Sequence, residues 1–161
     1  MLKDFDIHAP TDFDFIIGDW TVKHRKLKSI LDGCSEWEEF NGDSSTRKIL
    51  GGFGNLEDNH LHFPDSSVRA VAMRSYNEVL KHWSIWWLDG RHPDKLDVPV
   101  VGRFESGFGV FYADDIYNDM PIKVRFKWNS LNPNQPTWEQ AFSNDDGKTW
   151  EVNWTMSFSR I

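Results

Sequence analysis

Turn-forming residues recur every ten or so positions along this chain, which leaves no room for a long helix. The turn signals are Asp32-Gly33, Asn41-Gly42-Asp43, Gly51-Gly52, Pro64-Asp65, Asp89-Gly90, Asn118-Asp119, Asn132-Pro133-Asn134 and Asp146-Gly147. Between them lie short segments rich in aromatic and β-branched residues, which favour a pleated backbone. This spacing of turn signals and short segments predicts an all-β protein.

Apolar and polar residues alternate with a period of two inside these segments. The alternation is clearest from Glu151 to Arg160, where Val152, Trp154, Met156 and Phe158 share one face with Arg160. Segments 122–128 and 137–142 repeat the pattern. A strand of this kind has one buried face and one face in solvent.

Strand-like segments lie near 19–30, 36–41, 46–50, 54–63, 68–76, 82–88, 100–105, 108–115, 121–129, 136–143 and 149–160. Counting all but one of the short ones gives about ten strands. Sequential antiparallel strands form a meander, and a meander with one dry face removes its exposed edges by closing into a barrel. The sequence therefore predicts a single domain spanning 1–161, an antiparallel meander closed into a barrel. The irregular connection from Gly90 to Pro99 is long enough to cover a barrel mouth.

Composition excludes several classes of partner. The 25 acidic residues exceed the 18 basic ones, for a net charge of -7, which repels nucleic acid and anionic lipid. No apolar run approaches the roughly 18 residues that span a bilayer, and the acidic start at 1–6 does not fit a secretory signal. Cys34 is the only cysteine, so an intrachain disulfide and a cysteine zinc site are both excluded. We expect a cytoplasmic protein with no cofactor and no nucleic-acid or membrane partner.

Two ends of the chain carry a family resemblance. Gly18-Asp19-Trp20, at the entrance to the first long strand, resembles the Gly-x-Trp start of lipocalins and other calycins. In that superfamily the Trp lies at the closed end of the barrel and an Arg late in the last strand packs across it; Arg160 stands at the matching place. Further stretches resemble an uncharacterised bacterial lipocalin-like family, namely 20–27, 50–55, 83–87 and 138–143. The resemblance spans nearly the whole chain and implies a calycin barrel with a central cavity and no established activity.

Tryptophans make up much of the predicted interior of the barrel. Of the 9 in the chain, Trp20, Trp128, Trp138 and Trp154 fall on dry faces, and Trp83 and Trp87 share one face of their strand. An aromatic-lined cavity suits a planar or partly apolar small molecule. The alternative is that the rings simply fill the barrel.

A few polar residues are placed where they could contact a ligand. Counting by two from Trp20 puts His24 on the inner face, where an imidazole needs a hydrogen-bond partner or a ligand. The amide of Gln140 likewise needs a hydrogen-bond partner or a ligand. Arg74 and Arg103 could face either way, and they would neutralise an acidic head group if they point inward. The predicted ligand-binding residues are Trp20, His24, Trp87, Arg103, Trp128, Gln140 and Trp154.

Three functional hypotheses follow. The first is a barrel that binds a small, partly aromatic or apolar ligand. The second is an isomerase, lyase or hydrolase of a small organic acid, with His24 as general acid/base and an inward Arg holding the carboxylate. The third is a solidly packed barrel whose outside mediates assembly, with Trp86 in a homodimer interface.

His60-x-His62 matches the opening of the first cupin motif, in which two histidines on one strand face bind a metal. The acid expected three or four residues later is missing, since Ser66 and Ser67 stand there. Leu61 and Phe63 look like the buried side of the strand. The sequence therefore predicts two solvated histidines and no metal site, with metal binding as the alternative.

Residues 143–150 fit the Ser-x-Asp-x-Gly-x-Thr-Trp pattern called an Asp-box. Asp145 and Ser143 are expected to bond turn amides, and Gly147 to accept a positive φ. One copy predicts a locked hairpin and nothing more.

Overall fold

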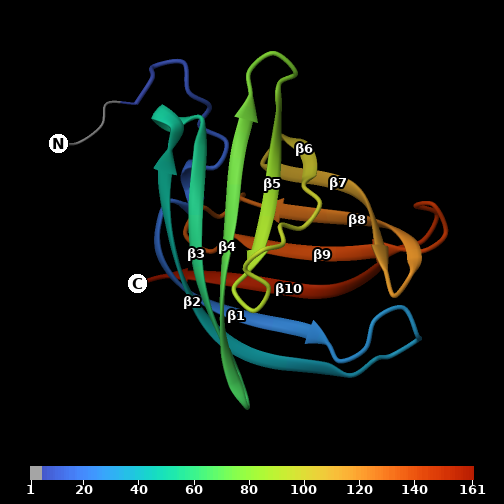
Figure 1. Ribbon diagram of the computed structural model, residues 1–161. Helices are drawn as coiled ribbons and strands as arrows, with labels where there is room; N and C mark the ends of the chain where they lie inside the picture. Colours follow the sequence, from blue (N-terminus) through green and yellow to red (C-terminus); the bar gives the residue numbers. More distant parts are fainter. Residues whose placement is uncertain (1–4) are drawn as a thin grey trace.

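The computed structural model describes residues 5–161 and contains one closed antiparallel barrel (Figure 1). Every strand pairs with its neighbours in sequence, and β1 closes the barrel against β10. The strands are β1 (Gly18–Leu27), β2 (Trp37–Ile49), β3 (Gly54–Phe63), β4 (Ser66–Asn77), β5 (His82–Asp89), β6 (Val100–Glu105), β7 (Phe108–Tyr117), β8 (Met120–Asn129), β9 (Thr137–Ser143) and β10 (Glu151–Arg160). The predicted all-β meander barrel of about ten strands is confirmed. Residues 1–4, where the predicted domain and the acidic start begin, lie outside the described residues.

The prediction was wrong at the turn signal Asn41-Gly42-Asp43, because β2 runs straight through it as one long strand. Gly42 pairs with Val22 of β1 and with Leu61 of β3. A Cβ at Gly42 would lie 2.9 Å from Nε2 of His24 and 2.7 Å from the backbone oxygen of His60. The glycine is therefore needed because the His24 ring and the backbone of β3 come close to it inside a paired strand, and it makes no turn.

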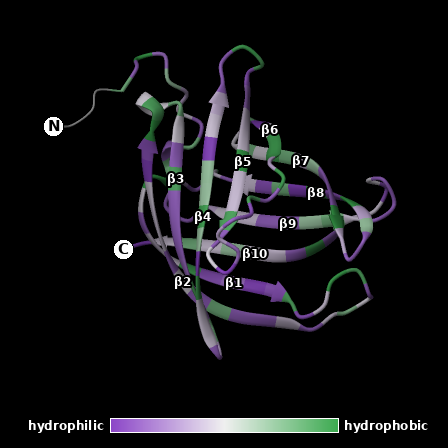
Figure 2. Ribbon diagram, in the orientation of Figure 1, coloured by the Kyte–Doolittle hydropathy of each residue, from purple (hydrophilic) through white to green (hydrophobic). Residues whose placement is uncertain are grey.

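The barrel has two halves whose strands run in different directions. In Figure 1, β3, β4 and β5 stand upright, whereas β8, β9 and β10 run across behind them. Apolar and polar residues alternate along many of the strands (Figure 2), as one-sided burial requires. The largest fully buried side chains include Trp20, Trp83, Phe111 and Phe158.

The segment before β1 plugs one end of the barrel. It contains the short 3₁₀ turn η1 (Asp14–Ile16), and Phe13 beside it meets the Trp83 ring edge-on at 4.9 Å between centroids. The indole N–H of Trp20 donates to the carbonyl of Ile16 at 2.8 Å. The Arg160 guanidinium lies 4.0 Å from the centroid of the Trp20 ring and donates to backbone carbonyls of the plug. The Trp–Arg contact implied by the resemblance is present, and it marks the closed end.

The connection from β5 to β6 crosses the other end. The backbone N–H of Asp97 donates to the carbonyl of Trp87 at 3.0 Å, and Leu96 forms an isolated bridge with Leu88. These bonds hold the connection against β5.

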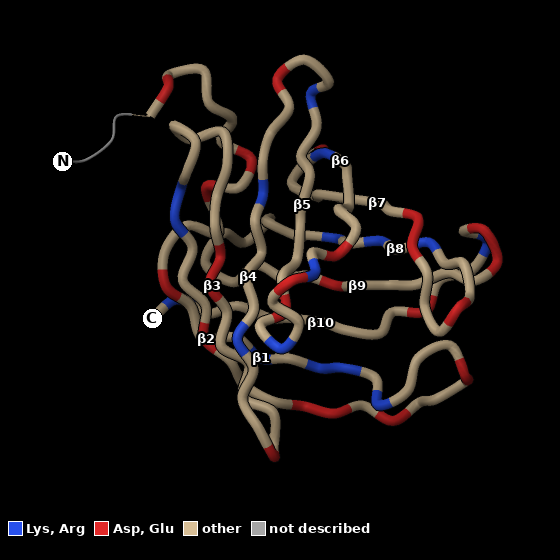
Figure 3. Tube along the Cα trace, in the orientation of Figure 1, with Lys and Arg blue, Asp and Glu red and all other residues tan. Residues whose placement is uncertain are grey.

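Lysines and arginines gather on β1 and β8 (Figure 3). Acidic side chains lie beside them: Arg25 Nε is 3.1 Å from Glu39 Oε1, and Lys123 Nζ is 2.8 Å from Asp114 Oδ1. The charges of these two strands are thus partly neutralised by their neighbours. No helix in the described part of the chain is long and apolar enough to cross a membrane.

The β9–β10 hairpin has the bonds that the Asp-box predicts. Ser143 Oγ accepts the backbone N–H of Gly147 at 2.8 Å, and Asp145 Oδ1 accepts that of Thr149 at 2.9 Å. Hydrogen bonds donated to the Asp145 carboxylate by the Thr149 hydroxyl, and then by the Thr149 backbone N–H and the Ser143 hydroxyl, lower the pKa of Asp145 to about 2.

Candidate functional site

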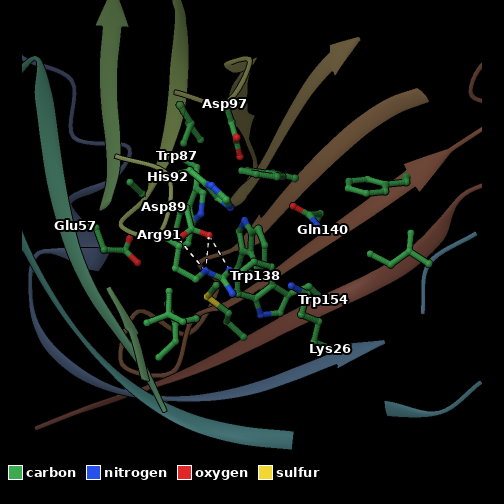
Figure 4. Close-up of a pocket in the computed structure, with 18 of the residues that line it drawn as sticks. Lys26, Glu57, Trp87, Asp89, Arg91, His92, Asp97, Trp138, Gln140 and Trp154 are labelled. Carbon is green, nitrogen blue, oxygen red and sulfur yellow. Dashed lines mark hydrogen bonds and ion pairs between the residues drawn. The ribbon is translucent and has the colours of Figure 1, made fainter. Parts of the chain in front are cut away.

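A cavity of about 400 Å³ lies inside the barrel, on the side of the β5–β6 connection (Figure 4). Four of the seven predicted ligand-binding residues line it, namely Trp87, Trp128, Gln140 and Trp154. The volume falls within the range of small-molecule sites. The barrel is therefore not packed solid.

Large rings from β5, β8, β9 and β10 form one side of the cavity, called here the aromatic wall: Trp87, Phe126, Trp128, Trp138, Phe142 and Trp154. Trp154 stands at its centre. The Trp138 and Trp87 rings meet it edge-on, with centroids 5.4 Å and 5.8 Å away and interplanar angles of 89° and 85°. Perpendicular contacts of this kind are favourable between aromatic quadrupoles, so the wall is preorganised.

His24 holds Trp154 from behind. The indole N–H of Trp154 donates to Nδ1 of His24 at 3.1 Å, and the imidazole stacks on Phe40 at 4.7 Å between centroids. Burial, and secondarily the Lys26 ammonium, lowers the pKa of His24 to about 4. The ring is therefore neutral at pH 7, and because Nδ1 accepts a hydrogen bond its proton sits on Nε2.

His24 is not among the residues that line the cavity. Its accepting nitrogen is already used by Trp154. The structure thus gives His24 the geometry of a positioning residue, and it does not favour the hypothesis in which His24 is a general acid/base.

On the side of the barrel that faces the aromatic wall, β2, β3 and β4 carry a cluster of buried polar side chains, called here the polar wall: Ser44, Thr46, Asn55, Glu57, Asn59 and Arg74. Glu57 and Arg74 reach the cavity. Arg74 donates to the Glu57 carboxylate through Nη2 and to Oδ1 of Asn55 through Nη1, the latter at 2.7 Å. Its guanidinium also lies 5.4 Å from the Trp128 ring, where the two walls meet.

The polar wall keeps unused hydrogen-bonding capacity. Within the described residues, Ser44 Oγ, Thr46 Oγ1 and Arg74 Nε are buried without a hydrogen-bond partner. Buried polar atoms are nearly always satisfied by protein, water or ligand. The atom that matters most for the cavity is Nε of Arg74, a donor on a residue that lines it.

Ionisable side chains surround the cavity mouth: Lys26, Asp89, Arg91, His92, Lys95 and Asp97. Asp89 and Arg91 form an ion pair at 2.7 Å, drawn in Figure 4 beneath His92. Burial, and then the neighbouring Asp115, raises the pKa of Asp97. Burial, and then Arg91, lowers the pKa of Lys26.

Two predicted ligand-binding residues besides His24 lie away from the cavity. Trp20 is at the closed end beneath Arg160. Arg103 is exposed on the outside of β6, because it alternates with Gly102 and Phe104, and Phe104 packs against the core. Arg74, whose facing the sequence left open, is the arginine that points inward.

Gln140 completes a polar pair and also lines the cavity. Its Nε2 donates to Oδ1 of Asn153 at 2.8 Å. Period-2 alternation next to Val152 and Trp154 predicts Asn153 on the solvent face, and this prediction is wrong: the register of β10 shifts between Val152 and Trp154, and Asn153 is fully buried. A β-bulge changes the facing of a residue without any signal in a period-2 pattern.

Sequence reasoning also missed Glu57, although a signal was available. Counting back by two from buried Leu61 gives Asn59, Glu57 and Asn55, and all three are buried. The inward positions of this strand before Leu61 are thus polar, and a search for apolar alternation does not detect them. Four residues of the mouth, Arg91, His92, Lys95 and Asp97, have no such pattern, since they lie in the irregular connection between β5 and β6.

The fold and the site together define a closed ten-stranded antiparallel barrel with a two-walled internal cavity. No model of a known protein family matches the chain, and no curated protein matches it. The site itself must therefore carry any proposal about function.

Proposed function

We propose that this chain is a lipocalin-like barrel that binds a flat, largely apolar small molecule carrying a hydrogen-bond acceptor or an anionic group. The observation that carries the proposal is the opposition of the aromatic wall to the Glu57–Arg74 pair across one cavity. The Trp20–Arg160 contact and the closed meander support the lipocalin-like assignment.

The aromatic wall would supply most of the affinity. Trp154 is already fixed by His24 and by two perpendicular indoles, so little side-chain freedom is lost when a ligand stacks there. Each well-placed aromatic contact contributes about 0.5–1.5 kcal/mol beyond the area it buries.

The polar wall would set the orientation. Arg74 Nε is a buried donor without a partner in the described chain, and an acceptor on the ligand would satisfy it. Glu57 already balances the charge of Arg74, which favours a neutral or singly charged polar group over a strongly anionic one.

The other expectations about partners stay predictions. The acidic net charge and the neutralised basic strands argue against a nucleic-acid partner. A single cysteine suits the reducing cytoplasm. Trp86 is half-buried on the outer side of β5, where a homodimer contact was predicted.

Tryptophan fluorescence and thermal shift against a panel of aromatic carboxylates, other small organic acids, fatty acids, haem and anilinonaphthalene sulfonate test the proposal. We expect saturable quenching by at least one flat aromatic acid, with a rise in melting temperature. Ala72→Phe, which fills the cavity, should abolish both signals. Trp87→Phe should reduce the quenching, whereas its outward neighbour Trp86→Phe should not. Binding that survives Ala72→Phe would contradict the proposal.

A further inference from the structure

We propose that the outer surface of β2 and β3 holds a site for a divalent transition-metal ion, with Asp43, His60 and His62 as its ligands. This site is separate from the cavity and does not depend on the proposed ligand. It uses the one histidine pair in the chain whose spacing places both rings on the same side of a strand.

The three side chains meet because of strand register. His60 and His62 are two residues apart on β3 and point away from buried Leu61. Asp43 stands directly opposite His60 in the β2–β3 pairing. One ligand atom from each residue lies within 4.8 Å of the other two, and His62 Nε2 is already 3.0 Å from Asp43 Oδ2.

These distances suit a small coordination sphere. Zinc binds imidazole nitrogen and carboxylate oxygen at about 2.0–2.2 Å, so tetrahedral ligand atoms stand about 3.3 Å apart. Asp43 and His62 are exposed side chains on fixed strands, and small rotations of them close the remaining gap. The fourth position would face solvent and take water.

The ligand chemistry selects the class of ion. Two imidazoles and one carboxylate favour Zn²⁺, Ni²⁺ or Cu²⁺ over the hard cations Mg²⁺ and Ca²⁺. Arg69 stands opposite His60 on β4 and opposes a cation, whereas Asp58 lies two residues before His60 on the same face. Together with Asp43, these charges sum to −1, which favours a cation.

The sequence pattern alone could not show this site. The cupin-like motif expects its acid shortly after His62, and Ser66 and Ser67 stand there, at the start of β4. The structure brings in Asp43 from the neighbouring strand, 17 residues before His60. The missing ligand of the sequence motif is thus supplied across the sheet.

Calorimetric titration of the untagged, metal-free chain with ZnCl₂ tests the site, with MgCl₂ as the hard-cation comparison. We expect one Zn²⁺ per chain with micromolar affinity and no Mg²⁺ binding. His60→Ala, His62→Ala and Asp43→Asn should each weaken zinc binding by at least about tenfold. His82→Ala, which changes a histidine of β5, should leave the affinity unchanged.

A second measurement on the unaltered chain guards against misfolded variants. Zn²⁺ should protect His60 and His62, but not His82, from acylation by diethylpyrocarbonate as mapped by mass spectrometry. The proposal is overturned if the chain binds no zinc at about 1 mM ion. It is also overturned if the double variant His60→Ala/His62→Ala binds as tightly as the unaltered chain, or if zinc protects all histidines equally.

Discussion

The two walls of the cavity are built on opposite principles. The aromatic wall on β5 and β8–β10 fills space with large rings, and its one critical hydrogen bond joins Trp154 to His24. The polar wall on β2–β4 uses short or charged side chains, and small residues such as Ala72 stand beside them. Arg74 reaches across to the Trp128 ring, whereas the short side chain of Ala72 leaves space in front of the aromatic wall.

The difference matters for stability as well as for binding. Burial of rings is favourable with any apolar neighbour, since it depends on area more than on direction. A buried carboxylate or guanidinium is favourable only with its partner in place. The aromatic wall should therefore tolerate modest substitutions, whereas the polar wall should fail when one member of a pair is removed.

Breaking the Glu57–Arg74 pair should give the largest effect. Glu57→Leu leaves the Arg74 guanidinium buried without its counter-charge. We expect a loss of about 3–5 kcal/mol in the free energy of unfolding, measured by urea titration. The double variant Glu57→Leu/Arg74→Met, which removes both charges, should recover most of that loss. If the double variant is as unstable as the single one, the polar wall depends on volume and not on charge pairing.

Because His24 fixes the aromatic wall, the stability of the chain should depend on pH through the titration of His24. The pKa of His24 is about 4 in the folded chain and 6.5 in its ordinary state. Below pH 6.5 the unfolded chain takes up a proton that the folded chain does not, so stability falls as the pH drops toward 4 and then levels off. At pH 4 we expect His24 to lower the free energy of unfolding by about 3 kcal/mol.

Two variants separate the contribution of His24 from that of the carboxylates. His24→Gln keeps an acceptor for the Trp154 indole but does not titrate, and it should remove this part of the pH dependence. Lys26→Met removes the second cause of the lowered His24 pKa. It should therefore narrow the pH range over which the stability of the chain falls. Identical stability–pH curves for the unaltered chain and His24→Gln would contradict the assignment.

One substitution in the polar wall should raise the stability of the chain slightly. Thr46 Oγ1 is buried and has no partner among the described residues. Thr46→Val replaces the hydroxyl by a methyl group of similar shape, and we expect it to stabilise the chain by about 1 kcal/mol in the same urea assay. A destabilisation would mean that a bound water or ligand normally satisfies this hydroxyl.

The barrel itself was predictable because its signals are local. Turn residues and period-2 alternation each act over a few positions, and the Asp-box needs only residues 143–150 to form its bonds. The dry faces of Trp128, Trp138 and Trp154 follow from the same counting. Four residues that line the cavity, Trp87, Trp128, Gln140 and Trp154, were predictable in this way.

The remainder of the site depends on which strands become neighbours. Gly42 looks like a turn residue until β1 and β3 press against it from both sides. Asn153 turns inward through a register shift that alternation cannot anticipate.

The sequence by itself determined the strands, their order and the side on which most side chains lie, because these depend on local preference and on burial of one face. Only the tertiary structure decided that Arg74 meets Glu57, that His24 holds Trp154, and that Asp43 joins His60 and His62. Each of these contacts joins residues on different strands. Strand register brings such residues together, and the register is not determined by the spacing of residues along one strand.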